Sequence, residues 1–284
     1  MMQKPPAATV EDGPRSAEPP LHLLEPFERA AFRAMHALEE RGMTITEPYL
    51  RGFGSAWMWL TIHRVATVHG LERLAGVRAD QSILLVANHR TYFDLYALGV
   101  LLHQKTPLHQ PVFCPVRADF FYERPLGVLV NLVVGGGRMF PPVFRDPAKA
   151  DFNKWSVNHL VELMRKKSVL VGFHPEGTRN KNEDPYTPLP AQPGVGKIVM
   201  ETWPVIVPAF INGLSGNLFA QARDNVTRAG RVVAVFGEPV DTTPWRKMGN
   251  RLASHKRIAD RLLEIIYGLG EEERAIRAAL PVTD

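Results

Sequence analysis

The sequence predicts an α/β protein with a mostly parallel central sheet, flanked by helices and preceded by an N-terminal helical hairpin. From Ser82 onward, short apolar runs typical of buried strands alternate with helical segments. Such alternation favours parallel strands that are covered by helices on both faces. With 284 residues and 45% hydrophobic content, the chain can bury a sizeable core without disulfides or metals.

Two helical segments precede the strands. Residues 25–40 carry apolar side chains at mixed three- and four-residue spacings, as in an amphipathic helix. Residues 54–68 place Trp57 and Trp59 close together, and the two segments predict the hairpin. Tryptophans at such positions either insert shallowly into lipid or pack on the domain core, and the sequence favours neither role.

Composition divides the chain into three parts. Residues 1–22 are rich in Pro, Ala and acidic residues and lack the apolar run of a signal peptide, so we expect a flexible leader. Residues 23–70 form the helical segment, a candidate for membrane contact, and residues 71–284 form the α/β domain. No apolar run approaches the roughly 20 residues that span a bilayer, so we expect a protein that lies on a membrane rather than through it.

The α/β part contains strands and helices in alternation. Strands are predicted at 83–87, 112–116, 168–173, 205–210 and 232–236. Helices are predicted at 94–103, 151–166, 195–202 and 243–268. The last helix is basic and amphipathic, and we favour packing of its apolar side on the sheet over contact with an anionic membrane.

The charge balance narrows the classes of partner. The net charge of +5 and the pI of about 9.4 suit nucleic acid, a phosphate-bearing substrate or an anionic membrane. The chain has neither an aromatic and basic ladder nor a recognised nucleic-acid module, so we do not expect nucleic-acid binding. The single cysteine, Cys114, excludes an intrachain disulfide.

The segment after the strand at 83–87 carries a histidine and a carboxylate. His89 precedes the next helix, and Asp94 falls in the first turn of that helix if the helix begins near Thr91. A carboxylate there can fold back to the imidazole, fix its tautomer and leave the other ring nitrogen free to take a proton. By spacing alone, however, a helix-capping Asp beside a surface His explains the pattern better.

A second polar segment follows the strand at 168–173. Glu176, Gly177, Thr178 and Arg179 form a loop in which backbone N–H groups and a guanidinium can cradle a phosphate. This segment by itself fits an ordinary surface turn with a solvated Arg about equally well. Polar groups at the carboxyl ends of strands in open α/β sheets face the ligand crevice, so both segments are expected there.

Taken together, the two segments resemble the signature blocks of the glycerolipid acyltransferase family, which includes 1-acylglycerol-3-phosphate and lysophospholipid acyltransferases. His89 to Asp94 matches the His, four residues, Asp block, with Asn88 before it. Phe173 to Arg179 matches the Phe-Pro-Glu-Gly-Thr-Arg block, with His174 inserted before the Pro. A further block, an apolar strand carrying Val-Pro, resembles residues 207–213, and the resemblance covers about residues 71–239.

The second block of the family is irregular in this chain. It normally reads Gly, two residues and Phe, followed by an Arg two or three residues later. Gly137 to Phe140 fits its start, but four residues intervene before Arg145. Either Arg145 or Arg138 supplies the phosphate contact that the resemblance implies, or the head group binds differently. The Pro141–Pro142 pair indicates a reshaped loop.

The resemblance implies a reaction and its partners. His89 would take the proton of a lysophospholipid hydroxyl as the oxygen attacks an acyl thioester, and Asp94 would orient His89. Backbone N–H groups of the Gly177 loop would stabilise the oxyanion, and Arg179 would hold the phosphate. The donor would be acyl-CoA or acyl-carrier protein, without a metal or redox cofactor. We expect a peripheral enzyme on the cytoplasmic face of the membrane.

Other classes fit the sequence less well. Gly213 to Asn217 lacks the second Gly of a serine hydrolase elbow, and Gly194 to Ile198 lacks the spacing of a P-loop. No His-Glu-x-x-His or Cys-x-x-Cys grouping predicts a zinc site. Glycerol-3-phosphate or a phosphate-free lipid stays open as the acceptor. A non-catalytic lipid-binding relative also stays open, although such a protein has no need of the His, Asp, Glu and Arg together.

Overall fold

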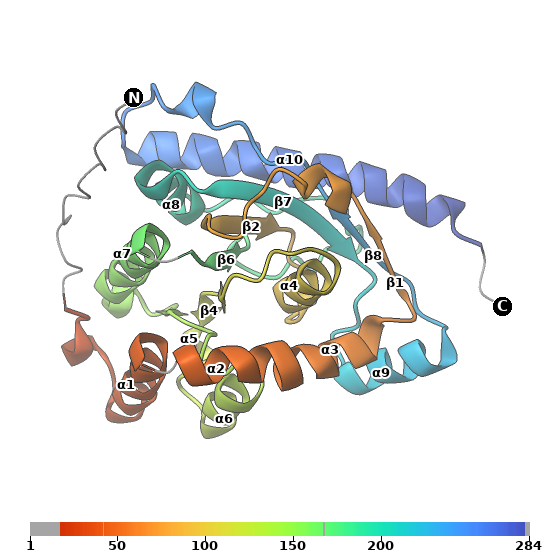
Figure 1. The fold of residues 1–284 in the computed structure, drawn as a ribbon. Helices are drawn as coiled ribbons and strands as arrows, with labels where there is room; N and C mark the ends of the chain where they lie inside the picture. Colours follow the sequence, from red (N-terminus) through yellow and green to blue (C-terminus); the bar gives the residue numbers. More distant parts are fainter. Residues whose placement is uncertain (1–17, 42, 167, 282–284) are drawn as a thin grey trace, which may run out of the picture.

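The computed structural model describes residues 18–41, 43–166 and 168–281 and is built around a six-stranded sheet (Figure 1). Every neighbouring pair of strands is parallel except the pair β7–β8, and helices lie on both sides of the sheet. The predicted fold class is therefore confirmed, with helices preceding the sheet. In spatial order the strands are β1 (Ala66–His69), β8 (Val232–Phe236), β7 (Val205–Asn212), β2 (Ile83–Ala87), β6 (Leu170–Phe173) and β3 (Val112–Phe113).

The N-terminal helices are α1 (Pro26–Arg41), α2 (Met43–Tyr49) and α3 (Ser55–Ile62), with a single π-helical turn at Leu50–Gly54. The helices of the α/β part are α4 (Asp94–Lys105), α5 (Ala118–Phe121), α6 (Pro125–Val133), α7 (Ala150–Lys166), α8 (Gly194–Thr202), α9 (Leu218–Thr227) and α10 (Leu252–Ala279). A second, two-stranded sheet pairs β4 (Val116–Arg117) with β5 (Pro142–Val143). Short 3-10 turns lie at Leu21–Leu23, Leu71–Leu74, Pro147–Lys149 and Thr243–Trp245.

The buried strand β2 separates two apolar cores. Leu84 and Val86 face the core formed with α7, α8 and α10, whereas Ile83 and Leu85 face the core formed with α3 and α4. This alternation follows from the two-residue period of a strand. Each fully buried Leu, Ile or Val contributes about 1.5–3 kcal/mol, so β2 and its flanking helices form a rigid base for the loop that follows.

A third core holds the N-terminal helix α1 against the domain. Phe32 and Met35 of α1 are buried against Phe140, Phe152 and Trp155. The rings of Phe32 and Phe152 meet edge to face at a centroid distance of 5.2 Å, a favoured aromatic geometry. The apolar pattern that predicted this helix therefore identifies part of its buried face, namely Phe32 and Met35, whereas Phe27 is 43% exposed.

Three segments have other bounds than the sequence predicted. The helix expected at 54–68 ends at Ile62, and residues 66–69 form β1, whose half-exposed Ala-Thr-Val-His sequence lacks a strand-like apolar run. The strand expected at 112–116 ends at Phe113, because the Cys114 N–H donates to the Arg138 carbonyl instead of to β6. The last helix begins at Leu252 rather than at Thr243 and packs its apolar side on the sheet, as we favoured.

The division into leader, helical segment and α/β domain stays a prediction. The edge strand β1 comes from residues before the predicted boundary at residue 70 and pairs with β8. Most of the predicted leader, residues 1–17, lies outside the described residues. Within the part of the chain that the structure describes, no helix combines the length and the apolarity that crossing a membrane requires.

Candidate active site

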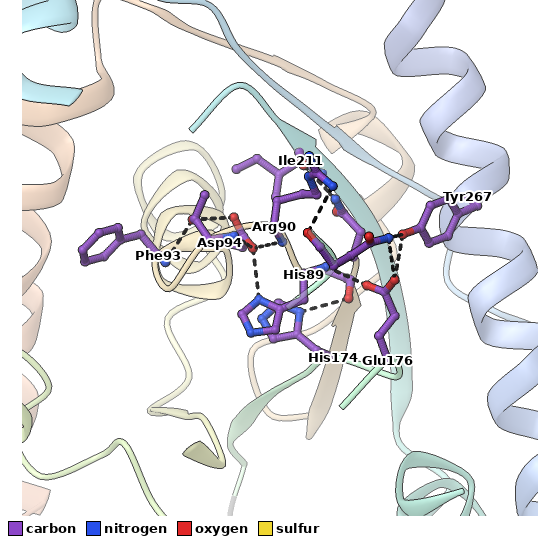
Figure 2. A network of polar contacts seen from close by, with 12 residues as sticks. His89, Arg90, Phe93, Asp94, His174, Glu176, Ile211 and Tyr267 are labelled. Carbon is purple, nitrogen blue, oxygen red and sulfur yellow. Dashed lines mark hydrogen bonds and ion pairs between the residues drawn. The ribbon is translucent and has the colours of Figure 1, made fainter. Parts of the chain in front are cut away.

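The two polar segments meet at one edge of the sheet. Strands β2 and β6 are parallel neighbours, with Val86 opposite Phe173, so the loops after both strands leave the sheet side by side (Figure 2). The His89 N–H donates to Glu176 Oε2 at 3.0 Å, and the Asn180 N–H donates to the His89 carbonyl at 2.7 Å. The residues predicted from two separate segments therefore lie in one site.

The third neighbouring strand, β7, also holds the first loop. The Asn88 side chain accepts from the Ile211 N–H at 2.8 Å and donates to the Ile211 carbonyl at 2.9 Å. Asn88 is completely buried. Its amide thus replaces a backbone partner at the end of β7 and fixes the chain one residue before His89.

His89 and Asp94 form a hydrogen-bonded pair. His89 Nδ1 lies 3.2 Å from Asp94 Oδ2. The same carboxylate accepts from the backbone N–H groups of Arg90 at 2.6 Å and Thr91 at 2.7 Å, and from the Thr91 hydroxyl at 2.7 Å. Helix α4 begins at Asp94 itself, so the carboxylate turns back over the preceding loop. These contacts fix the carboxylate before any substrate binds.

The surroundings of His89 keep its ring neutral at physiological pH. Burial lowers the pKa of His89 to about 4, and the positive charges of Arg179 and Arg117 act in the same direction. Burial raises the pKa of Asp94, and its hydrogen-bond donors act against that rise. Because a carboxylate oxygen accepts at Nδ1, we assign the proton to Nδ1, which leaves Nε2 with a free lone pair.

Glu176 braces the second loop from inside the protein. Its side chain is 1% exposed. Oε1 accepts from the Tyr267 hydroxyl at 2.8 Å, from the Leu189 N–H at 3.0 Å and from the Asn180 amide at 3.2 Å, while Oε2 binds the first loop. Both carboxylate oxygens therefore have protein partners, and Glu176 links the loops after β2 and β6 to helix α10.

Gly177 occupies a position that favours glycine. Its φ is +67°, and an added Cβ would lie 2.8 Å from Cγ of Gln192. The Gly177 N–H donates to the His174 carbonyl at 3.0 Å, so it is not available to an oxyanion. The backbone N–H groups of Thr178 and Arg179 donate to no acceptor among the described residues. They are therefore better placed than the Gly177 N–H to bind an oxyanion.

The arginines around the site differ in their availability. Arg138 is 5% exposed, pairs with Glu47 and donates to the Thr46 hydroxyl at 3.1 Å, so its charge is already compensated. Arg145 is exposed and has no ion-pair partner among the described residues. The Arg179 guanidinium lies 3.8 Å from the centroid of the Tyr92 ring, and it forms no ion pair with any described acidic residue.

One cavity of about 670 Å³ connects these groups. Its polar end is lined by His89, the loop 176–179, Arg145 and Arg138. Its wall continues over apolar side chains from α4, α7 and the β3–β4 region, namely Leu95, Val100, Val112, Cys114, Val116, Val157 and Leu160. This volume is typical of small-molecule sites, and its apolar wall suits a hydrocarbon chain.

Four features of the site were missed by the sequence analysis. Arg117 lines the cavity and pairs with Asp119, Tyr267 anchors Glu176, Asn88 pins the loop to β7, and His174 contacts His89. Two of them carried a sequence signal, because Asn88 precedes the first signature block and His174 interrupts the Phe-Pro-Glu-Gly-Thr-Arg block, but neither signal indicated these contacts. The contacts of Tyr267 and Asn88 join residues more than 80 positions apart, and the pairing of Arg117 depends on the path of one loop.

Among the residues that the structure describes, two groups of side chains bring ligand-type atoms within 4.8 Å of one another. They are His36, Glu39 and His159, and His89, Asp94 and His174. In the first group, His159 Nε2 lies 3.4 Å from Glu39 Oε2. In the second, Nδ1 of His89 faces Asp94 and Nδ1 of His174 faces the Ala87 carbonyl. We therefore interpret the second group as a hydrogen-bonded cluster and assign no metal to it.

Comparison with known proteins adds one finding. A family model described as Acyltransferase matches residues 65–212, which is just over half of the 284-residue chain. The matched range begins one residue before β1 and ends at the last residue of β7, so it contains both loops of the site. No curated protein matches the chain.

Proposed function

Because this chain belongs to the glycerolipid acyltransferase family and is thus an O-acyltransferase, we propose that it acylates a lysophospholipid hydroxyl, with 1-acylglycerol-3-phosphate as the acceptor. The donor is an acyl thioester, either acyl-CoA or acyl-carrier protein. The observation that carries this proposal is the neutral His89, held by Asp94 at the polar end of an apolar cavity beside Arg179.

The proposed reaction begins with His89 as a general base. The acceptor hydroxyl gives its proton to His89 Nε2 as its oxygen forms a bond to the thioester carbonyl carbon. Asp94 stabilises the imidazolium that results, as the carboxylate does in hydrolase triads. The C–S bond then breaks, and the departing thiolate takes the proton back from His89. No acyl-enzyme is needed.

The oxyanion and the phosphate require separate donors. We assign the oxyanion to the backbone N–H groups of Thr178 and Arg179, since the N–H of Gly177 is engaged. Arg179 and Arg145 are the arginines at the cavity whose charges no described acidic group neutralises. We therefore propose that these two arginines bind the acceptor phosphate and that Arg138 stabilises the fold through its ion pair with Glu47.

A peripheral position on the cytoplasmic face of the membrane is part of the proposal. Helix α6 exposes Leu126, Leu129, Leu132 and Val133, with exposed fractions between 37% and 63%. Tyr49 of α2 donates to the Val133 carbonyl of α6, and its ring contacts the ring of Phe53 at a centroid distance of 5.6 Å. Ile45 lies one helical turn before Tyr49 on α2, and all three residues are exposed. We call these seven residues the α6 face. Isolated exposed apolar residues are ordinary, but a contiguous group of this kind suits a lipid surface.

An acceptor and donor profile tests the proposal. Purified protein is incubated with radiolabelled acyl-CoA or acyl-carrier protein and a panel of acceptors: 1-acylglycerol-3-phosphate, other lysophospholipids, glycerol-3-phosphate and monoacylglycerol. We expect the highest kcat/KM with 1-acylglycerol-3-phosphate. Preference for monoacylglycerol would contradict the phosphate assignment, and preference for glycerol-3-phosphate would contradict the lysophospholipid assignment. Release of free fatty acid without an acylated product would contradict acyl transfer.

A further inference from the structure

The ring of His174 lies flat against the ring of His89. The two ring centroids are 3.8 Å apart and the ring planes differ by 9°, so the imidazoles are stacked (Figure 2). His174 is the residue that interrupts the Phe-Pro-Glu-Gly-Thr-Arg block in this sequence. The proposed reaction uses His89, Asp94 and the arginines, but it leaves His174 without a part.

His174 is held in place by the sheet. It follows directly on β6, and its Nδ1 donates to the carbonyl of Ala87, the last residue of β2, at 3.0 Å. Burial lowers the pKa of His174 to about 3, and the neighbouring His89 acts in the same direction. His174 therefore stays neutral and presents a fixed, uncharged aromatic face.

One hydrogen bond does not fix an imidazole. The contact between His89 Nδ1 and Asp94 Oδ2 restrains one ring atom, but the ring can still tilt about that contact. A flat ring at van der Waals distance removes this freedom because tilting would produce a clash. The direction of the His89 Nε2 lone pair is then defined by two independent contacts.

We propose that His174 is a positioning residue that holds the ring plane of His89, so that Nε2 points at the acceptor hydroxyl. This inference rests on the proposed function of His89 as the base. A misplacement of about 1 Å in a reacting group can cost about 100-fold in rate, so such a restraint matters for kcat.

The charged and titratable groups that face His89 fit this arrangement. Asp94 lies on α4, Arg117 on β4 and Arg179 on the loop after β6, and Glu176 reaches the His89 backbone. Two of these side chains are cations that oppose protonation of His89. A neutral His174 adds no third positive charge when the imidazolium forms.

Two substitutions separate stacking from the hydrogen bond. His174→Phe keeps a flat aromatic face and removes the bond to the Ala87 carbonyl, whereas His174→Ala removes both. We expect kcat to fall about 10- to 100-fold in the Ala variant, with KM values for donor and acceptor changed less than threefold. The Phe variant is expected to recover most of that loss. Equal losses in both variants, or wild-type kcat in the Ala variant, would overturn the proposal.

A measurement without turnover keeps this test separate from the proposed function. The titration of the His89 ring is followed by NMR in folded wild-type and variant protein, with thermal unfolding as the fold control. In wild type we expect the pKa near 4, and in the Ala variant we expect it to move towards 6.5 as water reaches the ring. An unchanged His89 titration and unchanged ring-proton shifts in the Ala variant would overturn the stacking role even if the acyl acceptor is misassigned.

Discussion

At the scale of single residues, the site depends on which hydrogen bonds are already used. Asp94 accepts from two backbone N–H groups and one hydroxyl besides His89, so its carboxylate cannot rotate away from the ring. Glu176 is engaged at both oxygens and braces the loops rather than facing the substrate. The same reasoning separates the buried, paired Arg138 from the exposed Arg145.

The Asp94→Asn variant tests the pairing with His89. The amide can donate to Nδ1 and so favours the tautomer whose proton sits on Nε2, where the base must be free. We expect kcat to fall by about 10²–10⁴ with little change in KM. Steady-state kinetics at saturating donor measure this, with Asp224→Asn on α9 as a control that keeps wild-type rates. A kcat within threefold of wild type would contradict the orienting role.

Substitution of Arg145 and of Arg138, the two arginines of the irregular block, should have different effects. Arg145→Gln should raise the KM for a phosphate-bearing acceptor about tenfold or more, because a hydrogen bond to a charged group contributes about 1.5–3 kcal/mol. Arg138→Gln should instead lower the melting temperature, because it removes the buried partner of Glu47 and leaves only the more exposed Arg51 paired with that carboxylate. Kinetics and thermal unfolding of both variants check this, and the reverse pattern would assign the phosphate to Arg138.

At the scale of helices and strands, the sequence predicted what apolar periodicity can show. The runs at 83–87 and 232–236 agree with β2 and β8, because buried strands of the main sheet are continuous in apolar residues. The sequence analysis did not predict strand β1 or helix α9. Strand β1 has no apolar run, and the buried residues of α9 are the polar Gln221 and Asn225. That β8 runs antiparallel to β7 depends on where α9 returns the chain, which periodicity does not encode.

Helix α6 carries the proposed membrane contact, in place of the Trp57/Trp59 segment. Trp57 stacks on Tyr96 at a centroid distance of 5.1 Å, and both tryptophans pack against the core beneath α3 and α4. On α6, by contrast, Leu126 and Leu129 are 63% and 55% exposed. The exposed leucines lie on one side of the helix, at a three-residue spacing.

We expect the double variant Leu126→Glu/Leu129→Glu to bind anionic liposomes at least tenfold more weakly than wild type. Each leucine that enters lipid contributes about 1.5–3 kcal/mol, and each glutamate is repelled by the surface. Co-sedimentation measures the binding. Phe219→Glu/Val226→Glu on α9 is the matched control, because both residues are highly exposed but lie outside the α6 face. Equal losses in both double variants would refute a role specific to α6.

At the scale of the whole molecule, the site is assembled from three distant parts of the chain. The loops after β2 and β6 carry the proposed catalytic groups, and Tyr267 of α10 holds Glu176 between them. The sequence predicted that the two loops share one edge, because parallel neighbouring strands end together. It could not predict the Tyr267 contact or the stacking of His174 on His89, because both require the packed structure.

The stability of the whole fold should depend on pH through the histidine His103 of α4. Burial, together with His109, lowers the pKa of His103 to about 4, whereas an unfolded histidine titrates near 6.5. The unfolded chain therefore binds more protons between these values. The stability that neutral His103 contributes is complete above pH 6.5 and is lost as the pH falls towards 4.

The unfolding free energy of wild type should fall between pH 7.5 and pH 5, and we expect it to fall less in His103→Leu. The two falls should differ by at most about 2 kcal/mol, which follows at pH 5 from a pKa of about 4 in the folded protein and about 6.5 in the unfolded chain. Urea unfolding of wild type and variant at both pH values measures this as a double difference, in which the contributions of all other groups cancel. An identical pH dependence in the two proteins would contradict burial of a neutral His103.

The proposed base is tested most directly by the turnover of His89→Ala. The variant and wild type are compared with labelled acyl thioester and 1-acylglycerol-3-phosphate at pH 7.5, with thermal unfolding as the fold control and the exposed His109→Ala as the matched variant. Removal of a general base typically costs about 10²–10⁴ in rate, so we predict a loss of at least 100-fold from a protein that unfolds like wild type. Turnover near that of wild type by the folded variant would contradict the account.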